Sequence, residues 1–449
     1  MNPESPTAGT VVPGRSAAGP ARASVDVPMS RTAAILLVCW FGVLLAVGER
    51  LVFSTGLGGG SGLLALGTTV SALIGIALLA VSPTARLDLG RLFVRALPVM
   101  AFFTLGLIVP LIGVIIGFPP RTVVGVLTPI ASVAFLLVGV RLAPLSRWSV
   151  LVGWAMTGAV VVNAAAGVLQ ALYHRGVVLP LASSLVAWDA SITQAYGIPL
   201  ITGRASGLYA NPNTYCLLGA MGLLFAAFGG RGAYRVPLAL GSLAVLLLGQ
   251  SRSALLGVTI ALLMGAVTHR VRTGRRFSRP VVIGSVVVAL VSIAALLAAV
   301  RLSPTFGSLL AARLAGLLTL VGGGTRELDP NLAARVGFWK AAWDAVLQAP
   351  LGVFGPPNTV LSSSIDNDYL RLLVQGGVLY AASYVLMLAW LAVVSARTLK
   401  PTLMLALPVL VAITSLTQTN STMVPFVSAF CLIAGASLLP LLAAEDGRT

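Results

Sequence analysis

Long apolar runs alternate with short polar gaps along almost the whole chain. Twelve such runs fall at about 32–48, 57–81, 96–116, 122–140, 148–172, 212–229, 234–249, 253–268, 281–300, 371–395, 401–417 and 421–440. A helix of about 20 apolar residues spans the hydrocarbon core of a bilayer, and a helix satisfies its own backbone polar groups there. The pattern therefore predicts an all-α polytopic membrane protein with about 12 transmembrane helices.

The lysine and arginine residues in the gaps predict how the chain is oriented. With the N-terminus inside the cell, every short inside gap carries at least two of these residues, in agreement with the positive-inside rule. Both termini are then cytoplasmic. Residues 1–30, rich in Pro, Ala, Gly and Ser, are predicted to form a disordered cytoplasmic tail, and residues 31–449 a single transmembrane domain. Two long outer loops follow from this topology, at about 173–211 and 301–370.

The second outer loop contains a predicted helix at about 331–347, with Asp329 and Pro330 before it as a start signal. Large apolar side chains recur there at helical spacing: Val336, Trp339, Trp343 and Leu347. Tryptophans on such a helix suit the membrane interface. Packing of the same side chains against other helices is the alternative.

The composition narrows the class of protein. The chain is 57% hydrophobic and 9% charged, whereas a soluble domain carries about 25% charged residues, so a soluble multidomain protein is excluded. The net charge of +17 does not indicate a nucleic-acid partner, because the basic residues lie in separate gaps and not on one exposed face. The spans carry almost no ionisable residues at depth, which argues against a proton-coupled transporter.

No metal or other cofactor is expected. The three cysteines, Cys39, Cys216 and Cys431, lie inside apolar runs and lack the spacing of metal ligands. The two histidines, His174 and His269, are too few for a histidine-rich metal site.

Polar side chains gather at four places, all on the predicted outer face. They are Arg204, Asn211 and Asn213 in GRASGLYANPN, Arg252 in QSRS, Arg335 and Trp339 on the predicted helix, and Asp366, Asn367 and Tyr369 in DNDYL. An arginine binds phosphate through two hydrogen bonds and keeps its charge, so arginines that converge at one outer mouth suit a diphosphate. Fixed cations stabilise the negative charge of a departing lipid diphosphate without a metal.

A carboxylate near such arginines can take the proton from an attacking sugar hydroxyl, and Asp366 is the candidate. Two simpler roles stay open at this stage. Each arginine can instead extend to lipid headgroups, and Asp366 can pair with an outer arginine.

At these positions the chain resembles the O-antigen ligase and O-antigen polymerase superfamily of bacterial membrane glycosyltransferases. The resemblance rests on four segments in order: GRASGLYANPNT, SRSA at the start of a span, RVGFWKAAWD followed by APLGVFGPPN, and DNDYLRLLVQGGVLY. It covers roughly residues 150–395, and beyond them only the hydropathy is similar. The resemblance implies a GT-C-like α-helical bundle with a large extracytoplasmic loop that contains short helices.

The resemblance also implies an activity. Such proteins are metal-independent glycosyltransferases that use undecaprenyl-diphosphate-linked glycans at the outer face of the bacterial cytoplasmic membrane, in cell-surface polysaccharide synthesis. Arg204 and Arg335 match the two functional arginines of the ligases. Ligases commonly have His-Asn where this chain has Asp366-Asn367, and Asp-Asn is more similar to the polymerase branch, which joins repeat units. Membrane lipids and a polysaccharide chain-length regulator are the further partners implied.

The interpretation that unites these features is a polysaccharide polymerase or ligase that inverts the anomeric centre. Arg204, Arg335 and Asp366 are its predicted catalytic residues. The predicted substrate-binding residues are Arg252, Asn211, Asn213, Asn367, Tyr369 and Trp339. The alternatives are O-antigen-ligase-type transfer of a finished glycan to another acceptor, a lipid-linked glycan flippase and a non-enzymatic scaffold. A flippase predicts polar residues along a mid-membrane path, and a scaffold predicts outer arginines that tolerate replacement.

Overall fold

The structure analysed is a computed structural model. It describes residues 31–47, 93–118, 126–145, 147–173, 204–209, 211–273, 330–355 and 365–443, with isolated positions at 70, 73, 90, 176–177 and 180–181. Within these residues every regular element is a helix and no strand occurs. The predicted all-α fold class is confirmed for this part of the chain.

The apolar runs within the described residues form helices. They are α1 (Arg31–Val47), α5 (Leu97–Ile115), α6 (Leu127–Leu142), α7 (Trp148–Tyr173), α9 (Pro212–Phe228), α10 (Arg235–Gly249), α11 (Arg252–Thr273), α15 (Asp368–Val394), α16 (Pro401–Thr414) and α17 (Val424–Ala443). The predicted tail, the run 281–300, almost all of the run 57–81 and much of both predicted outer loops lie outside the described residues. The count of about 12 spans therefore stays a prediction.

Four helices among the described residues are long and apolar enough to cross a membrane. They cover Leu97–Ile115, Trp148–Tyr173, Arg252–Arg272 and Asp368–Arg397. Six further apolar helices have 10–17 residues each. Apolar helices of this length indicate an integral membrane protein.

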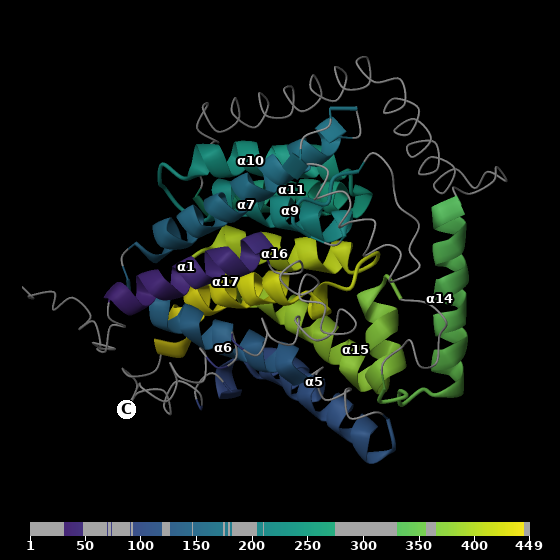
Figure 1. The fold of residues 1–449 in the computed structure, drawn as a ribbon. Helices are drawn as coiled ribbons and strands as arrows, with labels where there is room; N and C mark the ends of the chain where they lie inside the picture. Colours follow the sequence, from purple (N-terminus) through teal and green to yellow (C-terminus); the bar gives the residue numbers. More distant parts are fainter. Residues whose placement is uncertain are drawn as a thin grey trace, which may run out of the picture.

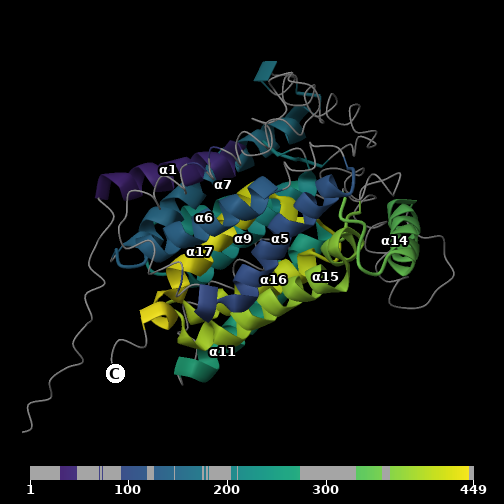
Figure 2. The same ribbon diagram turned by 90° about the horizontal axis from the view of Figure 1, so that it is seen from below.

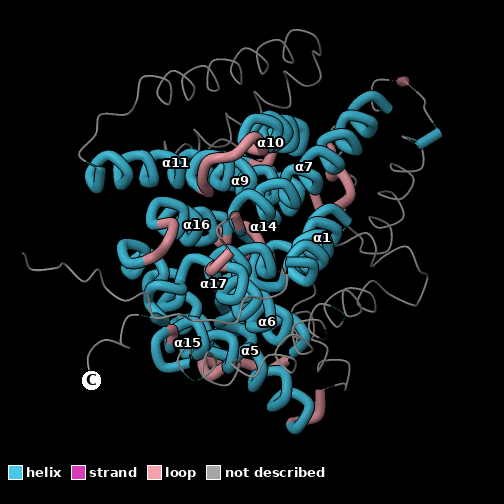
Figure 3. Tube along the Cα trace, turned by 90° about the vertical axis from the view of Figure 1, so that its left-hand side faces the viewer, coloured by secondary structure: helices cyan, strands magenta, loops and turns pink. Residues whose placement is uncertain are grey.

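The helices lie alongside one another, and one helix lies across them. In Figure 1 the long helices run roughly in one direction, and α14 (Pro330–Gln348) crosses one end of the bundle. Figure 2, seen from below, places α14 at the same end. Figure 3 looks along the bundle and shows α9, α10, α17 and α6 nearly end-on. The helix predicted at about 331–347 is confirmed as α14.

Glycines allow α6 and α17 to pack closely. A Cβ added at Gly139 would meet backbone atoms of Leu432 and Ala436, and a Cβ added at Gly435 would meet the backbone of Leu136. Small residues at an interface let membrane helices approach until their backbones nearly touch. The two glycines therefore set the spacing of this helix pair.

Helix α15 is broken at Gly377, where φ is +66°, a value that favours glycine. The carbonyl groups of Val374 and Gln375, just before the break, accept hydrogen bonds from the N–H groups of Val353 and Phe354 at 2.8 Å each. The segment that follows α14 thus satisfies backbone groups that the broken helix leaves open. These bonds tie α14 to the first part of α15.

Candidate functional site

Arg335 and Asp366 form an ion pair at the end of the bundle that α14 crosses. Arg335 lies in the first two turns of α14, and Asp366 lies just before α15. The Nη2 atom of Arg335 is 3.6 Å from Oδ2 of Asp366, and the two side chains are 23% and 41% exposed. The structure therefore brings together two of the three predicted catalytic residues.

Arg335 and Trp339 also carry buried donors that lack a partner. Nε of Arg335 and Nε1 of Trp339 are shielded from solvent, and neither makes a hydrogen bond in the described part of the chain. Because they are four residues apart on α14, the two side chains lie on one face of that helix. A buried donor without a partner costs about 1–3 kcal/mol, so this face of α14 suits a ligand that brings acceptor oxygens.

The surroundings of Asp366 change its acidity. Burial of the carboxyl group among protein atoms raises its pKa above the usual value, and the positive charge of Arg335 opposes that rise. Since 41% of the side chain stays exposed, water moderates the effect of burial. A carboxylate with a raised pKa holds a proton more readily, which suits a general base.

Arg204, Asn211 and Asn213 form a second group, where α9 begins and α10 ends. Nε of Arg204 donates to the carbonyl oxygen of Gly249 at 2.8 Å, and Nη2 donates to the side-chain oxygen of Asn213 at 3.1 Å. Asn211 is the N-cap of α9, and its side chain accepts the N–H of Asn213 at 2.8 Å. Arg204 thus places a positive charge at the C-terminus of α10, where it is favourable.

Two buried amides of α7 hold the loop that carries Arg204. Gln170 accepts the N–H groups of Ser206 and Gly207 at 3.0 and 2.9 Å, and Asn163 accepts the next N–H of the loop at 2.9 Å. Moving the loop would leave these buried polar groups unpaired, at a cost in free energy. The position of Arg204 is therefore set by the fold.

The two groups are separate. Within the described residues no hydrogen bond or ion pair joins Arg204 directly to Arg335 or Asp366. Arg252 is the first residue of α11 and is half-buried. Its neighbour Ser251 donates its N–H to Sγ of the buried Cys216 at 3.4 Å, which joins the start of α11 to α9.

Asn367 and Tyr369 both have partners within the protein. Asn367 is the N-cap of α15: its side-chain oxygen accepts the N–H of Leu370 at 3.1 Å, and its amide donates to the carbonyl of Leu416 at 3.0 Å. The hydroxyl of Tyr369 donates to the carbonyl of Ala412 at 2.9 Å. These bonds anchor the start of α15, and contact of either side chain with substrate stays a prediction.

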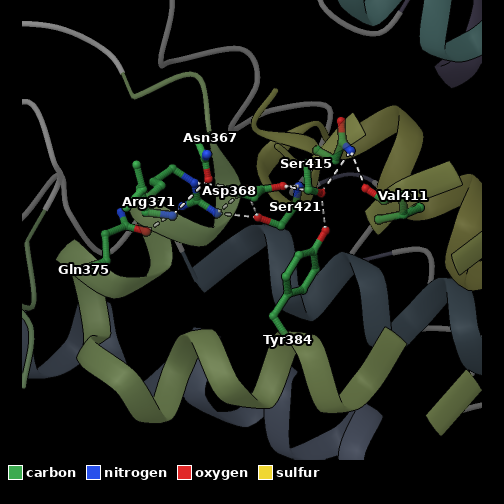
Figure 4. A network of polar contacts seen from close by, with 10 residues as sticks. Asn367, Asp368, Arg371, Gln375, Tyr384, Val411, Ser415 and Ser421 are labelled. Atoms are coloured by element: carbon green, nitrogen blue, oxygen red, sulfur yellow. Dashed lines mark hydrogen bonds and ion pairs between the residues drawn. The ribbon is translucent and has the colours of Figure 1, made fainter. Parts of the chain in front are cut away.

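Asp368, in the same DNDYL segment, is a buried acidic residue that was not among the predicted site residues. Asp368 is 0% exposed, and its carboxylate accepts hydrogen bonds from Arg371, Ser415 and Ser421 (Figure 4). Nη2 of Arg371 lies 3.0 Å from Oδ1 of Asp368. Arg371 also donates to the side chain of Gln375. The two buried charges compensate each other, as buried ion pairs must.

Ser415 and Ser421 belong to a polar segment that is longer than the hydropathy pattern predicts. The apolar runs 401–417 and 421–440 extended two helices into it, whereas α16 ends at Thr414 and α17 begins at Val424. The stretch SLTQTNST between them is almost wholly polar. That density of hydroxyl and amide groups is the signal that could have revealed the segment.

The charged side chains of these two groups are thus arginines and the partly exposed carboxylate of Asp366. Within the residues described, no three His, Cys, Asp or Glu side chains gather in a group that could hold a metal ion. Guanidinium groups bind phosphate oxygens, and a carboxylate accepts protons. Together they suit chemistry on a phosphorylated substrate.

Residues 237–385 match the family model described as O-antigen ligase. The matched segment includes Arg252, Arg335 and Asp366 and begins after Arg204. No curated protein matches the chain. The family match confirms the resemblance to the O-antigen ligase and polymerase superfamily over this segment. With the apolar helices, it indicates a glycosyltransferase-like integral membrane protein of O-antigen ligase or polymerase type in polysaccharide synthesis.

Proposed function

We propose that this protein polymerises undecaprenyl-diphosphate-linked glycan units at the outer face of the cytoplasmic membrane. The observation that carries the proposal is the Arg335–Asp366 pair, with the unpaired donors of Arg335 and Trp339 beside it. The pair lies inside the segment that matches the O-antigen ligase family. A fixed cation with unpaired N–H donors can stabilise the negative charge of a departing diphosphate. A carboxylate can accept the proton of an attacking hydroxyl.

The ion pair between Arg335 and Asp366 opens when the lipid-linked glycan that donates the sugar binds. The diphosphate of this glycan replaces Asp366 as the partner of Arg335 and accepts hydrogen bonds from the unpaired N–H groups of Arg335 and Trp339. Arginine suits this exchange because it binds carboxylates and phosphates through the same planar donors. Asp366 is then free to face the acceptor.

The reaction is a direct displacement at the anomeric carbon of the donor. A hydroxyl oxygen of a second lipid-linked glycan forms a bond to that carbon, and the bond from the carbon to the diphosphate oxygen breaks. The hydroxyl proton passes to Asp366, and undecaprenyl diphosphate leaves with the bonding electron pair. Attack from the face opposite the leaving group inverts the anomeric centre. The step needs no metal, because the arginines stabilise the charge that develops on the diphosphate.

The remaining predicted residues act around this centre. Arg204 and Arg252 add positive charge from the side of α9 and α11, where Asn211 and Asn213 offer hydrogen bonds to sugar hydroxyls. Asn367 and Tyr369 act in the same way from the start of α15. Membrane lipids surround the bundle, and a chain-length regulator is a further partner.

Ligase-type transfer of a finished glycan to another acceptor is the second candidate. The description of the matched family, O-antigen ligase, favours it. The same arginines and carboxylate would serve, since only the acceptor differs. Asp366, where ligases commonly have histidine, favours polymerisation.

Complementation of a deletion strain tests the proposal. The variants are Arg204→Ala, Arg335→Ala and Asp366→Ala, with Lys340→Ala as the matched control because Lys340 is an exposed cation on the same helix as Arg335. Surface polysaccharide length is read on a gel, and the membrane level of each variant is checked.

We expect Arg335→Ala and Asp366→Ala to leave single repeat units or unextended lipid-linked glycan, while Lys340→Ala makes normal polymer. Long polymer that stays unattached would support the ligase function instead. Normal polysaccharide from all three site variants would show that the arginines only anchor the protein to headgroups, and the catalytic proposal would be dropped.

A further inference from the structure

The segment between α16 and α17, residues 415–423, lies between the two groups of predicted site residues. We call it the connector. Six of its residues carry polar side chains that are buried or half-buried: Ser415, Thr417, Gln418, Thr419, Asn420 and Ser421. Oγ1 of Thr417, Oε1 of Gln418 and Oδ1 of Asn420 are buried and make no hydrogen bond in the described part of the chain. Most buried polar groups are hydrogen-bonded, and the other polar groups of the connector contact both sides of the proposed site.

On one side the connector holds the start of α15. The N–H and hydroxyl of Ser421 donate to the Asp368 carboxylate at 2.9 and 2.7 Å, and Ser415 donates to it at 3.3 Å. In the other direction, the N–H of Asp368 donates to the carbonyl of Ser415 at 2.9 Å. The carbonyl of Leu416 accepts the amide of Asn367 at 3.0 Å. Figure 4 shows these side chains converging on Asp368, two residues beyond Asp366.

On its other side the connector holds the starts of α11 and α9. The amide nitrogen of Gln418 donates to Oγ of Ser253 at 3.0 Å and to Oγ of Ser251 at 3.4 Å, and these serines flank Arg252. The hydroxyl of Thr214, in the first turn of α9, donates to Sδ of Met423 at 3.3 Å. The same short segment therefore bonds to both sides of the proposed site.

Within the residues that the structure describes, no direct bond joins one group of site residues to the other. Arg335 lies on α14 and Asp366 just before α15, whereas Arg204 bonds to α9 and α10. The hydrogen bonds of Gln418 and Ser421, which are buried or partly buried, join the start of α11 to the start of α15 through one chain segment. A rigid link of this kind fixes the geometry of two groups more tightly than apolar packing, because hydrogen bonds are directional.

We propose that the connector is the positioning element of the transfer site, and that Gln418 and Ser421 are its positioning residues. It sets the distance from Arg204 and Arg252, which add positive charge around the diphosphate, to Asp366, which receives the proton. This inference rests on the proposed function. Loss of the hydrogen bonds of Gln418 or of Ser421 removes no reacting group but misaligns the groups that remain. A misplacement of about 1 Å lowers a rate by as much as about 10²-fold.

The first test compares Gln418→Leu and Ser421→Ala with the control Ser383→Ala. Ser383 is a buried serine of α15 whose hydroxyl, among the described residues, donates to the carbonyl of Tyr380 in its own helix. Each full-length variant is purified in lipid nanodiscs and assayed with lipid-linked glycan extracted from the deletion strain. Ser421→Thr restores the hydroxyl and is the conservative comparison.

We expect kcat to fall at least about tenfold in Gln418→Leu and Ser421→Ala, with KM changed by less than about threefold. Ser383→Ala and Ser421→Thr should stay close to the unaltered protein. Unchanged kcat in both connector variants would overturn the proposal. So would a raised KM with normal kcat, because that result would make the connector a substrate-binding element.

A second measurement needs no activity. Spin labels at Asp344→Cys on α14 and Leu256→Cys on α11, both exposed positions, report the distance across the site once the exposed Cys39 is replaced by Ser. We expect Gln418→Leu to broaden or shift that distance, and Ser383→Ala to leave it unchanged. An unaltered distance in Gln418→Leu overturns the positioning role. If the distance shifts in Gln418→Leu but Arg335→Ala still makes polymer, the positioning role of the connector is retained and the proposed function is rejected.

Discussion

At the scale of single residues, Asp366 and Asp368 lie two positions apart in contrasting environments. Asp368 is fully buried, and both of its oxygens accept hydrogen bonds, including those of a compensating arginine. Asp366 keeps 41% of its side chain exposed and meets one cation at 3.6 Å. A general base needs a free lone pair, and the hydroxyl that gives up its proton must be able to reach it. Asp366 meets both needs, and Asp368 is suited to hold structure.

The pH dependence of activity follows from the surroundings of Asp366. A general base works only when deprotonated, so activity is lost as the pH falls through its pKa. Burial raises that pKa and Arg335 lowers it. We therefore expect Arg335→Gln, in its residual activity, to lose kcat/KM at a higher pH than the unaltered protein. The measurement is kcat/KM against pH.

Two controls accompany this prediction. Arg335→Lys keeps the positive charge and should move the acid limb less, and Lys340→Gln should leave it in place. An acid limb that moves to lower pH in Arg335→Gln, or does not move, would exclude Asp366 as a base coupled to Arg335.

At the scale of elements, the apolar pattern predicted the bounds of the helices but not which helices pack against each other. The bounds of α7 and α10 lie within about two residues of the runs 148–172 and 234–249, because a hydrocarbon solvent fixes where apolar runs begin and end. Hydropathy does not record which helix faces which. The close pairing through Gly139 and Gly435 depends on three-dimensional packing, so the sequence did not reveal it.

The α6–α17 pair gives an element-scale prediction. Gly435→Ala places a Cβ against the backbone of Leu136, and overpacking of this kind costs about 1–3 kcal/mol. We expect a lower apparent melting temperature in detergent and less folded protein. The matched control is Gly158→Ala in α7, because an added Cβ there meets nothing within 4 Å. Equal stability of the two variants would show that α6 and α17 can separate without penalty.

The difference between features visible in the sequence and contacts that depend on three-dimensional packing also explains how much of the site could be predicted. Arg335 and Asp366 were found because their chemistry is visible in the sequence, and their pairing was among the roles left open. The connector was not found, since Ser415 and Ser421 lay within apolar runs whose average hydropathy concealed them. Asp368 lies in the DNDYL segment, but its burial and its ion pair with Arg371 were not predicted. Buried polar networks depend on partners distant in sequence, which a hydropathy pattern does not contain.

At the scale of the whole molecule, segments predicted to lie on one side of the membrane meet in the structure. Lys400, predicted inside, has its ammonium 5.9 Å from the ring centroid of Trp148, at the inside start of α7. Arg95 donates to the carbonyl of Leu441, and both belong to predicted inside ends. The predicted outer segments meet in the same way around the connector. These contacts agree with the predicted alternation of the described helices, and the orientation in the membrane stays a prediction.

That orientation gives the last prediction. A membrane-impermeant maleimide added to whole cells should label Lys340→Cys on α14, and should label Arg272→Cys at the end of α11 only after the cytoplasmic membrane is opened. Both positions are exposed, and Cys39 is replaced by Ser so that no other exposed cysteine of the described residues reacts. The ends of α11 lie on opposite sides of a membrane if this helix crosses it. Labelling of Arg272→Cys in intact cells would place the connector and the Arg335–Asp366 pair inside, away from exported glycans, and polymerisation at the outer face would then be impossible.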